Sequence, residues 1–206
     1  MEFYDQKILP HLIDLACSAK QNRKQREKIV PLASGDVLEI GFGSGLNLPF
    51  YDPAKVRKIW GLEPSAGMRK KARRQLEASP LEVELIDLPG EEIPLQADSA
   101  DTVLVTYSLC TIPDAISALE GMRRVLKPGG QLLFCEHGKS PDANVRRWQD
   151  RLNPAWHAIA GGCNMNRDIP ALIETAGFRI KSDERMYIPG PRVLTYNYWG
   201  SAVAAD

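Results

Sequence analysis

The fold is decided by the stretch Val37-Leu38-Glu39-Ile40-Gly41-Phe42-Gly43-Ser44-Gly45. Four residues typical of a buried strand lead directly into three closely spaced glycines. Glycine lets the backbone turn sharply and lets a ligand lie directly against it. Open α/β sheets build nucleotide sites in this way at the carboxyl end of a strand. The stretch therefore predicts an α/β fold with a nucleotide-like ligand at the glycine loop.

The spacing of the glycines separates two kinds of ligand. A dinucleotide site has the pattern G-x-G-x-x-G, but the place of its third glycine is taken here by Leu46. Glu39, just before the loop, would repel a pyrophosphate but suits the cationic amino group of a methionine moiety. This favours S-adenosylmethionine (SAM) over NAD. A plain glycine-rich turn is the structural alternative.

The sequence around the loop alternates short apolar strands with helices, which predicts a mainly parallel sheet with right-handed crossovers. We expect further strands at Ile59–Leu62, Val83–Ile86, Val103–Thr106 and Gln131–Glu136. We expect helices at Ser65–Glu77, with Ser65 as its N-cap, and at Ala115–Leu126 and Ile169–Ala176. At the end of the chain, Phe178–Met186 and Val193–Val203 are predicted to form an antiparallel pair.

Several segments after the loop suit an adenosine ligand. Glu63 ends the second strand about 20 residues beyond the loop, where an acidic residue accepts hydrogen bonds from ribose hydroxyls. Residues after the second, third and fourth strands could line the rest of the site, although each alone could be ordinary loop chemistry. The candidate cofactor-binding residues are Tyr4, Glu39, Gly41, Gly43, Gly45, Asn47, Glu63, Pro64, Met68, Gly90, Glu91 and Tyr107.

Four motifs occur in a fixed order along the chain: V-L-E-I-G-x-G-x-G, then L-E-P, then G-E-x-I-P, then R-V-L-K-P-G-G. This order, over about Leu32–Phe134, resembles class I SAM-dependent methyltransferases of the ubiquinone-biosynthesis type. The resemblance implies a doubly wound, Rossmann-like sheet of seven mainly parallel strands, the last of them antiparallel, preceded by a helical segment. The length of 206 residues fits one domain, so a single methyltransferase domain is expected over residues 1–206.

Two further resemblances concern the methyl acceptor. The stretches Phe134–His137, Leu152–His157 and Gly161–Arg167 are similar to the methyltransferase-like thiol S-methyltransferases, which methylate small alkyl thiols. The animal members begin with a hydrophobic membrane-anchoring segment, whereas this chain begins with an amphipathic helix. The region from Arg26 to Tyr51 also resembles bacterial phosphatidylethanolamine N-methyltransferases. A thiol acceptor is favoured, and a lipid or other small amine stays open.

Residues that could act on the acceptor come from three places. Residues 1–32 are expected to form a helical lid, and residues 140–166 an insertion that carries the substrate site. Tyr107 is expected to form the wall of the methyl pocket, and His137 and His157 are candidate bases. The structural alternative for each histidine is to fix a loop. We interpret Cys163 as a packed small residue, because no base partner for it is evident in the sequence.

Composition limits the partners. Lys plus Arg and Asp plus Glu each number 26 in 206 residues, so no net charge attracts nucleic acid or an anionic membrane. The basic run from Lys20 to Lys28 is interpreted as a solvated helix face, with a lipid-headgroup patch as the alternative. Peripheral membrane contact is therefore not favoured. The oligomeric state is left open.

The four cysteines form no C-x-x-C pair, so no zinc ribbon, redox motif or other metal site is expected. No signal peptide or membrane span is recognised, and a cytoplasmic location is expected. The predicted function is methyl transfer from SAM to a small-molecule acceptor. A non-catalytic SAM-binding protein and an NAD-dependent oxidoreductase are the alternatives.

Overall fold

The computed structural model describes residues 9–205. Seven strands form one sheet in the order β3-β2-β1-β4-β5-β7-β6. The first five strands are parallel, and β7 runs antiparallel to both of its neighbours, β5 and β6. The strands are β1 (Gly35–Ile40), β2 (Val56–Leu62), β3 (Glu82–Ile86), β4 (Ala100–Thr106), β5 (Leu126–His137), β6 (Phe178–Tyr187) and β7 (Tyr196–Ala204). The expected fold class is confirmed.

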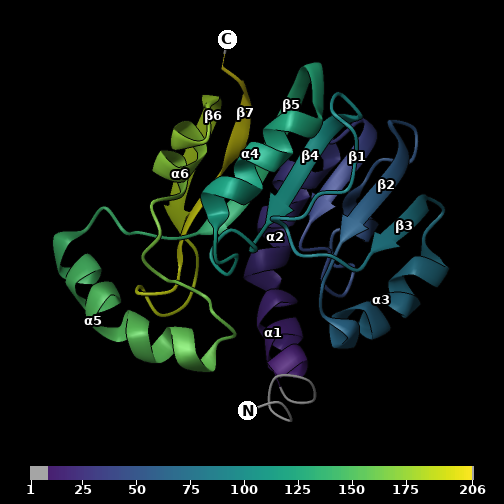
Figure 1. The fold of residues 1–206 in the computed structure, drawn as a ribbon. Helices are drawn as coiled ribbons and strands as arrows, with labels where there is room; N and C mark the ends of the chain where they lie inside the picture. Colours follow the sequence, from purple (N-terminus) through teal and green to yellow (C-terminus); the bar gives the residue numbers. More distant parts are fainter. Residues whose placement is uncertain (1–8, 206) are drawn as a thin grey trace.

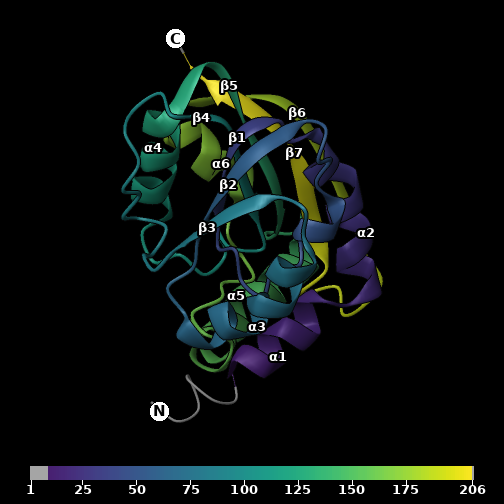
Figure 2. The ribbon, with the colours of Figure 1, turned by 90° about the vertical axis from the view of Figure 1, so that its right-hand side faces the viewer.

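Helices cover both faces of the sheet (Figures 1 and 2). On one face, α2 (Lys20–Ile29) and α3 (Ala66–Ala78) pack over one apolar cluster, and on the other face α4 (Ala115–Val125) and α6 (Ile169–Thr175) pack over a second. Neighbouring residues of one strand serve opposite clusters, as with Val103 and Leu104 in β4. Such strands are buried on both faces, which is why they appear in the sequence as continuous apolar runs.

Two more helices lie beyond the carboxyl ends of the strands, where Figure 1 shows them below the arrowheads: α1 (Leu9–Cys17) and α5 (Ala143–Ile159). The sequence predicted an insertion at 140–166 without assigning it a helix, whereas α5 has 17 residues. Its one buried residue is Gln149, whose side chain bonds to Gly138, Ser140, Met165 and Val193. The apolar residues Trp148, Leu152 and Ile159 recur at helical spacing but are exposed, and Pro154 lies inside the helix.

The predicted elements are present, with shifted ends. Strand β7 begins at Tyr196 instead of Val193, because Leu194 and Pro191 form a turn. Ser65 caps α3 as expected, since its hydroxyl accepts from the Met68 N–H at 3.3 Å. Short 3-10 turns lie at Val30–Leu32 and Leu48–Phe50. Within residues 9–205, no helix combines the length and apolar character needed to cross a membrane.

Candidate active site

Two cavities lie side by side at the carboxyl edge of the sheet. The glycine-loop cavity, of about 370 Å³, is lined by the glycine loop and by residues that follow β2, β3 and β4. The cysteine cavity, of about 340 Å³, is lined by the end of β5, by residues near the end of α5 and by the start of β7. The residues that line both cavities are Leu9, Ile13, Cys17, Tyr107 and Thr111. The two spaces therefore share one wall.

The three glycines of the loop all have positive φ, between +60° and +79°, but they meet different surroundings. A Cβ on Gly41 would lie 2.0 Å from Oγ of Ser108, so the backbone here packs directly on the segment after β4. A Cβ on Gly43 would have Met68 Cε as its nearest neighbour, at 3.5 Å, and both residues line the glycine-loop cavity. Gly45 packs against Gln75 and does not line the cavity. Gly43 is therefore the position where a side chain would fill the cavity.

Glu63, at the end of β2, lines the same cavity and is 7% exposed. Its carboxylate accepts hydrogen bonds from the backbone N–H of Gly43 at 2.9 Å and of Ser65 at 2.8 Å. Burial raises the pKa of this carboxyl despite the two N–H donors. Each carboxylate oxygen retains a second lone pair, which can accept from a ligand hydroxyl.

Glu39 lies one layer behind the cavity instead of in its lining. Its carboxylate accepts from Nδ2 of Asn47 at 2.9 Å and from the hydroxyl of Tyr51 at 2.6 Å. Burial raises the pKa of Glu39 to about 7, although both hydrogen bonds act in the opposite direction. The sequence-based interpretation of direct contact between Glu39 and a ligand is therefore not what the structure displays. Asn47, which lines the cavity, stands between them.

Arg26 also lines the glycine-loop cavity. The sequence places Arg26 in a basic run predicted to be solvated, but the residue is only 5% exposed. Its Nε donates to Oδ1 of Asn47 at 3.0 Å, and its guanidinium lies 4.9 Å from the ring centroid of Tyr107. A cation is thus buried between the loop and the wall of the two cavities. Ile29 and Val30, three and four residues further on, are buried on the same side of the helix, so helical spacing from them is the signal that could have found Arg26.

The remaining cofactor-binding candidates fall into two groups. Pro64, Met68, Gly90 and Glu91 line the glycine-loop cavity from the segments after β2 and β3. Tyr4 lies outside the described residues. A glycine cradle, a buried carboxylate with free lone pairs and an apolar shelf at Met68 together fit an adenosine ligand with ribose hydroxyls.

Tyr107 is the residue that separates the two cavities. It is one of two described non-glycine residues with positive φ, at +54°. Such strain persists only where the surroundings fix it, and here its hydroxyl donates to Oδ1 of Asn197 at 2.8 Å. Burial raises its pKa well above the ordinary value for tyrosine. Tyr107 therefore acts as a neutral wall and is poorly suited to proton transfer.

His137, the last residue of β5, lines the cysteine cavity together with three cysteines, Cys17, Cys110 and Cys163. Its Nε2 lies 3.2 Å from Sγ of Cys163, and the ligand atoms of Cys110, His137 and Cys163 all lie within 4.8 Å of one another. Burial lowers the pKa of His137, but Cys163 and Glu136 raise it by more. The interpretation of Cys163 as a residue without a base partner is therefore wrong, because residues distant in sequence meet here.

His157 does not belong to this cluster. It lies on the exposed side of α5 and does not line either cavity. Its neighbour Trp156 lines the cysteine cavity instead, and the buried indole Nε1 has no hydrogen-bond partner among the described residues. Successive helix residues point about 100° apart, so only one of the pair can face the cavity.

Asn164 and Arg167 fix the segment after β4 instead of capping α6, whose N-cap is Asp168. Nδ2 of Asn164 donates to the carbonyl of Cys110 at 3.1 Å, and Arg167 donates to the carbonyls of Leu109 and Ile112. From the opposite side, Glu136 Oε1 accepts from the N–H of Ser108 at 2.7 Å and of Leu109 at 3.1 Å. The main chain that carries Cys110 is therefore held on both sides.

Helix α1 closes the site over both cavities. Asp14 accepts from the hydroxyl of Ser44 in the glycine loop at 2.5 Å and pairs with Lys71 of α3 at 3.3 Å. Leu9 and Ile13 of the same helix line both cavities. The helix is thus fastened to the loop by one face and covers the site with its apolar residues.

Comparisons with known proteins agree with this geometry. Residues 38–134 match a family model described as a methyltransferase domain. The human thiol S-methyltransferase TMT1B is 33% identical over 196 residues, which cover 85% of this chain and 80% of the human protein. Phosphatidylethanolamine N-methyltransferase of Cereibacter sphaeroides is 29% identical, over 66% of this chain and 70% of its own length.

A solved SAM-dependent methyltransferase from Thermotoga maritima superimposes with a TM-score of 0.68 at 19% identity, over 98% of both chains. That likeness establishes the shared fold. The family match goes further, because it extends over the glycine loop and Glu63, and the human relative covers most of the chain. The chain belongs to the class I SAM-dependent methyltransferases, with SAM as its methyl donor and a small molecule as its methyl acceptor.

Proposed function

We propose that this methyltransferase acts on a small thiol, with SAM in the glycine-loop cavity and the acceptor in the cysteine cavity. The observation that carries the proposal is the wall that the two cavities share at Tyr107 and α1. Because the same residues line both cavities, ligands bound in the two cavities would lie next to each other. The 33% identity to human thiol S-methyltransferase TMT1B supports the choice of a thiol.

SAM supplies a methyl group already activated on a sulfonium, so that transfer needs only an in-line nucleophile. In the overall reaction the acceptor loses its S–H proton to solvent, a sulfur–methyl bond forms, and the electron pair of the broken bond stays on the departing thioether. The protein contributes proximity, orientation and exclusion of water. Leu9 and Ile13 of α1 exclude water from above, and Tyr107 sets the boundary between the partners.

The residues proposed to hold SAM have separate tasks. The backbone at Gly43 provides close contact, Glu63 accepts from the ribose hydroxyls, and Met68 provides an apolar surface for the adenine. Asn47 presents a polar side chain to the cavity, and Glu39 holds Asn47 in place. Glu39 thereby acts through Asn47 and not by its own contact.

The lining of the cysteine cavity supports a small neutral acceptor. None of the described residues that line it is Asp, Glu, Lys or Arg. Apolar side chains from α1, α5 and the segment before β7 form most of the surface, including Leu12, Trp156, Ile188 and Leu194. A cationic amine would be bound there without a counter-charge, which is costly, whereas a neutral alkyl thiol would be bound without that cost.

A lipid amine is the second candidate. Leu12 at the cavity mouth and Leu15 on the same helix are 49% and 72% exposed. Exposed leucines beside a cavity mouth are typical of surfaces that touch a bilayer. The 29% identity to a phosphatidylethanolamine N-methyltransferase points in the same direction.

Methyl-labelled SAM distinguishes the two candidates. The purified chain is incubated with alkyl thiols, phenols, soluble amines and phosphatidylethanolamine vesicles, and Gly43→Val serves as the inactive control. We expect turnover of alkyl thiols without vesicles. Methylation of phosphatidylethanolamine that requires vesicles, with no turnover of any soluble thiol, would promote the lipid candidate.

A further inference from the structure

We propose that Cys110, His137 and Cys163 form a zinc site in the cysteine cavity, and that the acceptor thiol binds as the fourth ligand of the ion. This inference rests on the proposed thiol acceptor for the identity of the fourth ligand. The three protein ligands come from the segment after β4, from the end of β5 and from the segment after α5. They are brought together only by the fold.

The distances suit a tetrahedral ion. Ordinary zinc–sulfur and zinc–nitrogen bonds place tetrahedral ligand atoms roughly 3.5–3.8 Å apart. Nε2 of His137 lies 3.2 Å from Sγ of Cys163, and no pair among the three ligand atoms exceeds 4.8 Å. Side-chain shifts well under 1 Å would therefore bring all three to zinc geometry.

The donor set selects the kind of metal. Two thiolates and an imidazole are soft and borderline ligands that zinc prefers, whereas calcium and magnesium require oxygen ligands. With two thiolates and a neutral imidazole, a Zn²⁺ ion makes a cluster of zero net charge. Such a cluster fits a cavity whose described lining has no Asp, Glu, Lys or Arg.

The ligands are held before any ion arrives. The main chain of Cys110 is tied to the segment of Cys163, since its carbonyl accepts from both the N–H and Nδ2 of Asn164, at 2.8 and 3.1 Å. Glu136, next to His137, holds the N–H groups of Ser108 and Leu109. The three elements are thus linked to one another by hydrogen bonds close to the ligands.

The site also has an open position. All three ligands line the cysteine cavity, whose volume of about 340 Å³ leaves room for a small acceptor. Three protein ligands with an open fourth position are typical of catalytic zinc. An acceptor thiol that binds there loses its proton to solvent and becomes a metal-bound thiolate, with no change in oxidation state.

The geometry favours this role of His137 over that of a general base. A base needs a free ring nitrogen facing the acceptor, but Nε2 faces the thiol of Cys163 and Nδ1 is buried without a partner among the described residues. An ion between Nε2 and the two sulfurs would be coordinated by that nitrogen.

Titration of the full-length, metal-free chain with Co²⁺ tests the site without any need for turnover. We expect one equivalent to give a thiolate-to-cobalt charge-transfer band and the strong visible bands of a tetrahedral site. Zn²⁺ should displace the cobalt. Cys110→Ser and Cys163→Ser should each weaken Co²⁺ binding at least tenfold. The matched control is Cys17→Ser, which changes a thiol of the same cavity outside the cluster and should keep the bands.

Calorimetry with S-adenosylhomocysteine (SAH), the demethylated product of SAM, shows whether each variant is folded. A lost band then reports the loss of a metal-binding side chain and not unfolding. Adding a small alkyl thiol should shift the visible bands, and its methyl thioether should not. Absence of the bands in the wild type, or equal bands in Cys163→Ser, would overturn the inference. Thiol turnover in a chain without these bands would leave the proposed function standing. Bands without thiol turnover would overturn the proposed function and the thiol as fourth ligand, but would leave the metal site standing.

Discussion

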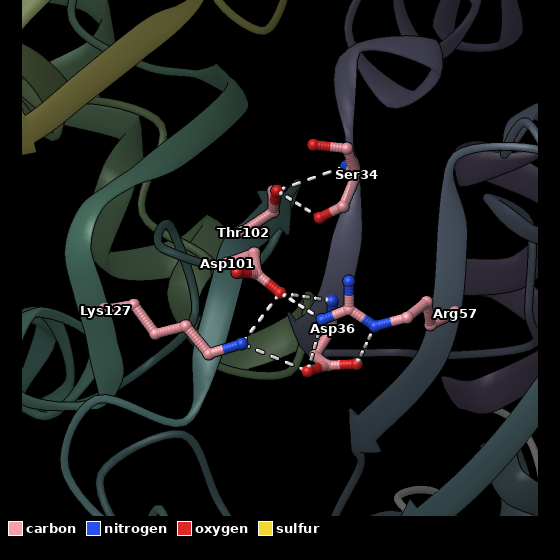
Figure 3. A network of polar contacts seen from close by, with 6 residues as sticks. All are labelled: Ser34, Asp36, Arg57, Asp101, Thr102 and Lys127. Atoms are coloured by element: carbon pink, nitrogen blue, oxygen red, sulfur yellow. Dashed lines mark hydrogen bonds and ion pairs between the residues drawn. The ribbon is translucent and has the colours of Figure 1, made fainter.

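At the amino ends of β1, β2, β4 and β5, charged side chains pair with one another, whereas at the carboxyl ends the polar groups surround two cavities. The second residue of each of these strands carries a charge: Asp36, Arg57, Asp101 and Lys127. Figure 3 shows the carboxylate of Asp101 between Arg57 and Lys127, with contacts of 2.8 and 2.9 Å. The same carboxylate also accepts from the N–H of Asp36. Each of these four charges meets an opposite charge.

The carboxyl end contrasts with this in its unpaired polar atoms. The buried atoms Glu136 Oε2, His137 Nδ1 and Trp156 Nε1 have no hydrogen-bond partner among the described residues. Unsatisfied buried groups cost stability, so their presence here suits a place where a ligand will be bound. The amino end of the sheet thus contributes stability, whereas the carboxyl end contains buried polar groups that a ligand could bind.

The largest expected effect is on the glycine loop. Gly43→Val places a side chain in the glycine-loop cavity, so SAH affinity should fall at least ~1000-fold, about 4 kcal/mol. Calorimetry measures the affinity. Gly129→Val is the matched control, because Gly129 has a φ of +81° at the amino end and a Cβ there meets nothing within 4 Å. Unchanged SAH affinity in Gly43→Val, or equal losses in both variants, would break the comparison.

The second effect is a pH dependence of the free energy of unfolding, which has opposite signs at the two ends of the sheet. Burial raises the pKa of Glu39 to about 7, despite Asn47, Tyr51 and the cation of Arg26; the carboxyl of Glu63 also acts to raise it. The stability from Glu39 is therefore fully present below its ordinary pKa of 4.5 and is lost as the pH rises through about 7. The loss in the free energy of unfolding from this one group is about 3 kcal/mol at most.

Urea unfolding of Glu39→Gln and the wild type between pH 4.5 and 7.5 checks this effect. The variant should gain stability relative to the wild type across that range, since glutamine stays neutral. At the amino end the sign is opposite: Arg57 lowers the pKa of Asp36, so its contribution is lost only as the pH falls below 3.8. Parallel curves for variant and wild type would show that Glu39 is not the group that titrates.

The third effect concerns Glu63, which is proposed to bind the ribose hydroxyls and also accepts a hydrogen bond from the glycine loop. Glu63→Ala should weaken SAH binding by about 2 kcal/mol, the usual loss for a hydrogen bond to a charged group. The melting temperature of the SAH-free protein should also fall, because the N–H groups of Gly43 and Ser65 lose their acceptor. Normal SAH affinity with a lowered melting temperature would make Glu63 purely structural.

The smallest effect is at the amino end. Asp101→Asn should cost about 1 kcal/mol of stability, because Arg57 is 63% exposed and water screens the pairing. The melting temperature should fall by about 2–4 °C, and less at high salt. SAH affinity, measured by calorimetry, should not change. A loss of SAH affinity would mean that the two ends of the sheet are coupled.

The sequence predicted the centre of the sheet because β1, β4 and β5 each contain a short, mostly apolar run. It did not assign α5 as a helix, because Pro154 in its interior is a residue that helices disfavour. It assigned Arg26 to a solvated face because exposed basic neighbours surround it in sequence. The sequence predicted His157 as a candidate base, because periodicity alone does not give the rotation of a helix about its axis.

The fold and the methyl donor could be read from the sequence by itself, because the glycine loop is a continuous segment whose ligand contacts are set by its own backbone. The geometry of the cysteine cavity was decided only by the tertiary structure. Cys110, His137 and Cys163 lie on three elements separated by 26 residues or more, and only the pairing of β4 with β5 and the return of the chain after α5 place them together. Side chains that meet through sheet order leave no spacing in the sequence from which their contact can be predicted.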